Sequence, residues 1–173
     1  MNETMDILVV EDDPNDLELT VRSLRKAELP LTVHIARDGP EALDYLFCQG
    51  SFATPGAAPR PKLVLLDLKL PKLDGIEVLQ ALRADPRTRE LPIVVMTSSR
   101  QQRDIDVCYR LGVNSYVVKP VDAQTFTESV QQVGAYWLRV NHAPQAAPGQ
   151  PRSKKPPARD TPQGPAASGA EPS

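Results

Sequence analysis

Residues able to bind a cation or a phosphoryl group directly follow four short apolar runs of the sequence. Glu11 and Asp12 follow the first of these runs, Asp67 a second, and Thr97 and Lys119 two later ones. If the ends of these runs meet, the carboxylates raise one another's pKa unless a cation compensates them, and such hard oxygen ligands suit Mg²⁺. An aspartate fixed at the end of a strand can attack a phosphoryl group, whose charge a hydroxyl and an ammonium then neutralise. The pattern therefore predicts phosphoryl chemistry at Asp67.

The apolar runs themselves are typical of strands buried on both faces. They are short and rich in β-branched residues, and several are apolar throughout instead of alternating with polar residues, which favours a parallel sheet. The predicted strands are Ile7–Val10, Leu31–Ile35, Leu63–Leu66, Ile93–Met96 and Ser115–Val118.

A stretch with helical spacing of apolar residues follows each predicted strand. The first helix is expected to begin at Asp13-Pro14, because an acidic N-cap followed by Pro favours a helix start. The others are expected from about Pro40, around Ile76–Leu82, around Ile105–Leu111, and from near Asp122 to Trp137. This alternation predicts a five-stranded parallel sheet with helices on both faces, a doubly wound (βα)5 flavodoxin-like α/β sandwich. Ligands of such sheets bind beyond the carboxyl ends of the strands.

The composition predicts one domain followed by a tail. Residues 143–173 are rich in Pro, Ala and Gly and contain no aromatic residue, Leu, Ile, Val or Met. They are expected to be disordered, because they have too little apolar surface to offset the chain entropy of folding. The domain is expected over residues 1–142, with its core at about 6–138.

Charge and hydropathy exclude several functional classes. The chain carries 20 Lys and Arg against 22 Asp and Glu, and the part before residue 143 is mildly acidic, so no nucleic-acid partner is expected. No apolar run is long enough for a membrane span, and acidic residues stand where a secretory signal would be positive. A cytoplasmic protein without membrane association is expected.

Simpler roles remain open for the same residues. Asp13 and Asp16 fit the first turn of a helix, where acidic residues cap backbone N–H groups. Thr97 and Ser98 fit the start of the fourth helix in the same way, and Lys119 fits an ordinary exposed lysine.

Together these residues resemble the receiver domain of two-component response regulators, over essentially all of Asp6–Trp137. The resemblance implies that Asp67, within Leu-Leu-Asp-Leu-Lys-Leu-Pro-Lys-Leu-Asp-Gly, is the phosphoacceptor. It implies that Glu11 and Asp12 bind Mg²⁺ together with Asp67 and the main-chain carbonyl of Lys69. It further implies a signalling protein, not an enzyme with a turnover substrate.

The resemblance also assigns the residues that sense the phosphoryl group. Thr97 and Lys119 match the sensing hydroxyl and cation, and Tyr116 matches the aromatic switch residue. The Lys119-Pro120 peptide bond is expected to be cis. Lys69 departs from the more usual Asn or small residue, and we hypothesise that it tunes the lifetime of the phosphorylated state.

Three further features resemble one group of stand-alone regulators, those related to the cyanobacterial phytochrome response regulator. They are the long surface loop Ser51–Pro61, Asp85-Pro86, and the ending Tyr136-Trp137-Leu138. This resemblance implies a phytochrome-type sensor histidine kinase as phosphodonor and a homodimer formed through the last two helices and the last strand. From the residues alone, the two rings at positions 136 and 137 fit either core or interface.

Two rival functions remain. A phosphorylation-independent interaction module would share the fold, although such modules usually lose the aspartate, the acidic pair or the lysine. A phosphatase with an aspartate nucleophile would require a second acid two residues after Asp67, where this chain has Lys69.

Overall fold

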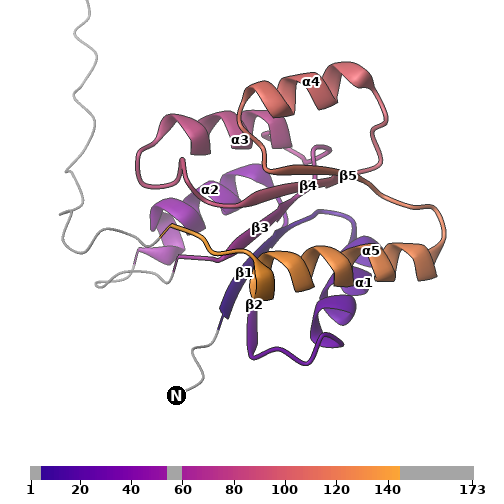
Figure 1. Ribbon diagram of the computed structural model, residues 1–173. Helices are drawn as coiled ribbons and strands as arrows, with labels where there is room; N and C mark the ends of the chain where they lie inside the picture. The colour runs from indigo at the N-terminus through magenta and orange to yellow at the C-terminus, as the bar shows by residue number, and fades with distance from the viewer. Residues whose placement is uncertain (1–4, 54–59, 145–173) are drawn as a thin grey trace, which may run out of the picture.

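The computed structural model describes residues 5–53 and 60–144 of the chain. Strands and helices alternate along it (Figure 1). The strands are β1 (Met5–Val10), β2 (Leu31–Ala36), β3 (Leu63–Leu66), β4 (Ile93–Thr97) and β5 (Ser115–Val118). The α-helices are α1 (Pro14–Arg25), α2 (Gly39–Phe47), α3 (Gly75–Ala84), α4 (Gln102–Arg110) and α5 (Ala123–Ala135). A short 3-10 helix η1 (Gly50–Phe52) follows α2, and a π-helical turn η2 (Tyr136–Val140) extends α5.

The strands form one parallel sheet in the order β2-β1-β3-β4-β5, which confirms the predicted flavodoxin-like α/β fold. Every residue of β3 and β4 is buried, as the uninterrupted apolar runs predict for strands covered on both faces. The predicted tail and most of the predicted Ser51–Pro61 loop lie outside the described residues.

Two apolar layers sandwich the sheet. Helices α1 and α5 lie side by side against one face (Figure 1). Leu17 and Leu24 of α1 and Phe126 of α5 belong to one buried apolar cluster with residues of the sheet such as Val9 of β1. Helices α2, α3 and α4 contribute to the cluster on the other face. No helix in the described part of the chain is long and apolar enough to cross a membrane.

Between the neighbouring strands β1 and β3, the order in which strands are added to the sheet reverses. After β1 the chain crosses to β2 on one side, and after β2 it returns to β3 on the other side of β1. Val10 pairs with Leu66, so the residues that follow them, Glu11 and Asp67, emerge together at the same edge. Thr97 pairs with Val118 in the same way and brings Lys119 to this edge.

Candidate functional site

The three predicted acidic residues meet at the switch point of the sheet. One carboxylate oxygen from each of Glu11, Asp12 and Asp67 lies within 4.8 Å of the other two. Glu11 and Asp67 are buried, whereas Asp12 is exposed at the mouth of the site. Several hard oxygen donors with one side open to water suit a small divalent cation, so these residues fit a metal such as Mg²⁺.

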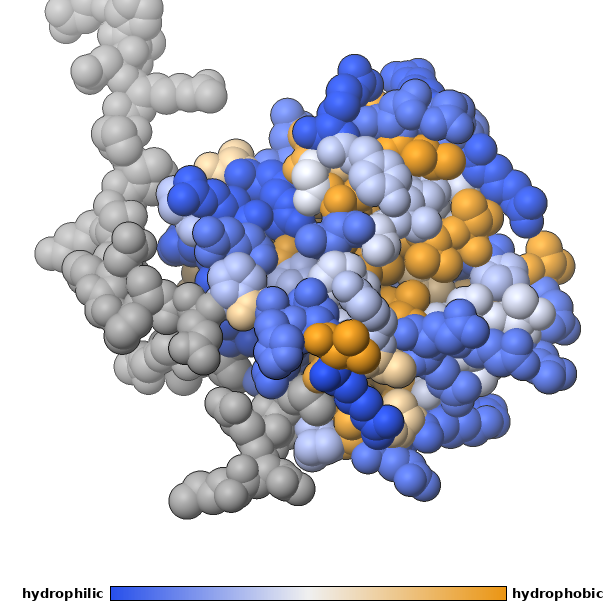
Figure 2. Space-filling view, in the orientation of Figure 1, coloured by the Kyte–Doolittle hydropathy of each residue, from blue (hydrophilic) through white to orange (hydrophobic). Residues whose placement is uncertain are grey.

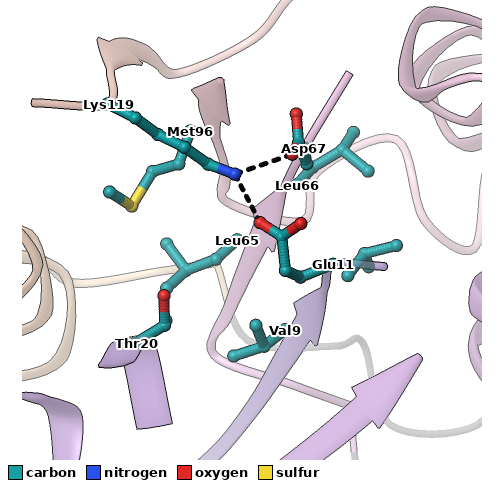
Figure 3. Close-up of a pocket in the computed structure, with 9 residues that line it drawn as sticks. Val9, Glu11, Thr20, Leu65, Leu66, Asp67, Met96 and Lys119 are labelled. Carbon is teal, nitrogen blue, oxygen red and sulfur yellow. Dashed lines mark hydrogen bonds and ion pairs between the residues drawn. The ribbon is translucent and has the colours of Figure 1, made fainter. Parts of the chain in front are cut away.

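The ammonium of Lys119 is the centre of the site. Its Nζ donates hydrogen bonds to Glu11 Oε2 at 2.6 Å, to Asp67 Oδ2 at 2.7 Å and to Asp16 Oδ2 at 2.8 Å. Figure 3 shows the first two of these bonds. Lys119 itself is buried, so the alternative of an ordinary exposed lysine is wrong.

The expectation of a cis Lys119-Pro120 bond is also wrong, since the described chain contains no cis peptide bond. The trans form is the ordinary preference even before proline. Lys119 N donates to the Thr97 carbonyl at 2.8 Å and so continues the β4–β5 pairing by one residue. The ammonium reaches the carboxylates from this backbone position.

Burial and ion pairing shift the pKa values of the two groups that face each other. Burial raises the pKa of the Glu11 carboxyl to about 7, against the opposing effect of the hydrogen bond from Lys119. Burial by itself lowers the pKa of Lys119, but hydrogen bonds to Asp16, Asp67 and Glu11 outweigh it and raise that pKa above its usual range. Lys119 is therefore a permanent cation, while the charge of Glu11 changes near neutral pH.

Backbone geometry fixes the side chain of Asp67. Lys69 N donates to Asp67 Oδ1 at 3.1 Å, and the Lys69 side chain is exposed. The chain turns back so sharply that a Cβ on Gly75 would lie 2.2 Å from the Asp67 carbonyl oxygen. Only glycine fits at this close approach, because any other residue would push the start of α3 away from the end of β3.

A small cavity lies beneath the ammonium. Val9, Thr20, Leu65 and Met96 line it together with the charged groups (Figure 3). Its largely apolar walls keep the local dielectric low and strengthen the interactions of Lys119 with its carboxylate partners.

Thr97 connects the site to α4 and β5. Its side chain is fully buried, and its Oγ1 accepts a hydrogen bond from Ser99 N at 3.3 Å. Ser99 Oγ donates to Asp104 Oδ2 at 2.5 Å, and Tyr116 Oη donates to the Ser99 carbonyl at 3.1 Å. The cap of α4 is Gln101, so Thr97 does not cap this helix. The loop after β4 thus links Thr97 to Tyr116.

The two acids at the start of α1 have separate roles. Asp13 caps the helix as predicted, because its Oδ1 accepts from Asn15 N and Asp16 N at 2.9 Å each. Asp16 is not a cap, since its carboxylate reaches Lys119. Sequence reasoning missed this contact, because acidic residues in the first turn of a helix usually serve the helix itself.

Comparison with known proteins gives one consistent family. Residues 7–131 match the family model described as the response regulator receiver domain. The response regulator Rcp1 of Synechocystis sp. is 36% identical over 140 residues, which cover 81% of this chain and 93% of that relative.

Three solved structures are similar to this chain over nearly their whole length. The phosphorylated cyanobacterial phytochrome response regulator RcpA has a TM-score of 0.78 at 36% identity, covering 83% of this chain and 100% of its own. The Mn²⁺-bound form of response regulator Rcp1 has a TM-score of 0.77 at 35% identity, covering 82% and 99%. The bacteriophytochrome response regulator AtBRR is 49% identical with a TM-score of 0.63, covering 81% and 99%.

Proposed function

Because this chain belongs to the family of response regulator receiver domains, we propose that Asp67 accepts a phosphoryl group from a phytochrome-type sensor histidine kinase. Receiver domains are phosphoacceptor signalling proteins, and similar proteins serve phytochromes. The observation that carries the proposal is the ammonium of Lys119, held at 2.7 Å from a buried aspartate beside two further acids. We propose that residues 1–142 form the receiver domain. We also propose the cytoplasm as its location, because ATP is available there as the source of the phosphoryl group for the kinase.

The proposed metal is Mg²⁺, with Glu11, Asp12, Asp67 and the main-chain carbonyl of Lys69 as its ligands. Carboxylates with an exposed side suit this ion, and the similar regulator Rcp1 has been solved with Mn²⁺. When bound, Mg²⁺ supplies positive charge to the phosphoryl oxygens.

The residues of the chain perform the transfer by position and charge. A carboxylate oxygen of Asp67 attacks the phosphorus, the P–O bond forms as the P–N bond to the kinase histidine breaks, and the nitrogen keeps the electron pair. The transition state is loose, so correct placement and charge neutralisation supply most of the catalysis. Lys119 provides the fixed cation, and the Lys69 N–H holds the second oxygen of Asp67.

We propose that Thr97 and Tyr116 report the phosphoryl group to the surface of the protein. If Thr97 turns its hydroxyl toward the phosphoryl oxygens, it gives up the hydrogen bond that it accepts from Ser99 N. The carbonyl of Ser99 in turn accepts a hydrogen bond from the Tyr116 hydroxyl, so a shift of Ser99 reaches Tyr116. A local change of charge then biases the positions of α4 and β5.

Phosphotransfer from purified kinases tests the proposed partner. With Mg²⁺, the label on the histidine of an autophosphorylated phytochrome-type kinase is expected to move to this protein within seconds to minutes, and transfer from an unrelated sensor kinase should be much slower. Equal rates would reject the phytochrome-type pairing. If no kinase and no small acyl phosphate labels the protein, the phosphorylation-independent module becomes the better interpretation.

Mg²⁺ affinity is expected to rise with pH. Below a pKa of about 7 the Glu11 carboxyl binds a proton that the cation must displace. Below this pKa one proton is released for each cation bound, so the affinity falls about tenfold for each unit by which the pH is lowered, whereas above it the affinity hardly changes. Because the pKa lies midway between pH 6 and pH 8, the Mg²⁺ affinities of the wild type measured by calorimetry at these two pH values should differ about tenfold in total. The variant Glu11→Gln should bind Mg²⁺ more weakly with a flat profile, and a flat profile in the wild type would contradict the assignment.

We further propose a homodimer that uses α4, β5 and the end of α5. Figure 2 shows apolar side chains gathered over β5 between α4 and α5. Tyr109 of α4 and Tyr136 and Val140 of η2 are exposed by half or more, whereas Trp137 packs partly against the core. A two-fold dimer would bury the same patch from both copies.

Light scattering tests this dimer. Changing both Tyr136 and Val140 to Ser is expected to shift the mass-average from dimer to monomer. Ile35→Ser is the matched control, because Ile35 is also an exposed apolar residue but lies on β2, at the opposite edge of the sheet. A monomeric wild type, with or without phosphorylation, would exclude the dimer.

A further inference from the structure

We propose that Asp16 is a positioning residue: it holds one hydrogen of the Lys119 ammonium in the unphosphorylated protein and releases it to the phosphoryl group on Asp67. This inference rests on the proposed function of Asp67. Asp16 thereby sets how readily the phosphorylated state forms.

The hydrogen-bonding capacity of Lys119 is fully used before phosphorylation. An ammonium has three N–H donors, and Nζ makes one bond each to Glu11, Asp16 and Asp67. A phosphoryl group on Asp67 brings new anionic oxygens, and these form strong charge-assisted bonds with an ammonium. Phosphorylation also removes the charge of the Asp67 carboxylate, so the bond from Lys119 to Asp67 passes to the phosphoryl group. Any further bond from the ammonium to the phosphoryl oxygens must be taken from Glu11 or Asp16.

Burial decides which partner is exchanged. The Glu11 side chain is 5% exposed, so water cannot readily replace the ammonium at its oxygens. The Asp16 side chain is 37% exposed, so water can replace the ammonium at its oxygens. The bond to Asp16 is the one released at lowest cost.

The local structure of α1 makes Asp16 available for this task. Asp13 already serves as the helix cap, and it accepts from Asp16 N. The carboxylate of Asp16 lies in the first turn of α1, where the helix dipole stabilises a negative charge after Lys119 has left.

Beryllofluoride, a mimic of the bound phosphoryl group, measures the balance between the two states. In Mg²⁺, Asp16→Asn is expected to bind it about threefold to tenfold more tightly than the wild type, because a neutral acceptor competes less well for the ammonium than a carboxylate does. Asp16→Glu keeps the charged partner and should stay near the wild-type affinity. Fluorine NMR of the bound species and calorimetry provide the readout.

The matched control is Asp13→Asn. It removes one acidic charge from the same helix start and keeps a good capping residue. The Asp13 carboxylate accepts from the backbone N–H groups of Asn15 and Asp16, whereas the carboxylate partners of Lys119 are Glu11, Asp16 and Asp67. If both Asn variants tighten binding equally, general charge explains the effect and the inference is overturned. Wild-type affinity in Asp16→Asn overturns it as well. If the wild type does not bind beryllofluoride at all, the proposed function fails together with the inference.

Discussion

Replacing Asp67 with Asn is expected to abolish phosphorylation of this protein. The change removes the nucleophilic oxygen but keeps the shape of the side chain, and Lys119 and the Lys69 N–H remain close by. With Mg²⁺ and a small acyl-phosphate donor, the intact mass of the wild type should increase by one phosphoryl group. The variant should gain none over the same period.

A control separates loss of the nucleophile from a general loss of acidic charge. Asp106→Asn removes an exposed carboxylate from α4, away from the site, and should leave phosphorylation at the wild-type level. Far-ultraviolet circular dichroism checks that both variants are folded. Phosphorylation of the Asp67→Asn variant would show that another residue is the acceptor.

Replacing Lys119 with Met is expected to cause the second large effect, a loss of stability. The change leaves the buried carboxylates of Glu11 and Asp67 without their cation. Removing one partner of a buried ion pair typically costs about 3–5 kcal/mol of the free energy of unfolding. Urea denaturation at pH 8 without Mg²⁺ measures this difference directly.

The loss should depend on pH in a defined direction. The pKa of Glu11 is already raised to about 7 in the folded protein and should rise further once Lys119 is gone. The folded state then binds more protons than the unfolded state, so stability falls as pH rises and recovers as pH is lowered toward 5. Lys72→Met is the control, because Lys72 pairs with Asp38 at the exposed surface and its loss should change little. Equal losses in the two variants would refute a special role of the buried lysine.

The fold and the location of the site were predictable from the sequence because both depend on local patterns. Runs such as Leu63–Leu66 are apolar throughout, and this is possible only for strands covered on both faces. Parallel strands joined by helices place all their carboxyl ends at one edge, so residues that follow the strands must meet there. Asp67 and Lys119 could therefore be brought together although 52 positions separate them.

The partners of each side chain at that edge were decided only by the tertiary structure. Asp13 and Asp16 share one helix start and one residue type, yet Asp13 caps α1 and Asp16 binds Lys119 across 103 positions of sequence. The hydrogen bonds that link Thr97 through Ser99 to Tyr116 could likewise be seen only in the tertiary structure. The raised pKa of Glu11 also depends on its burial there. Contacts of this kind depend on strand register, helix orientation and burial, which follow from the packing of the whole domain. Periodicity and local propensity determine which elements form and where they end, and packing then selects among the polar groups that meet there.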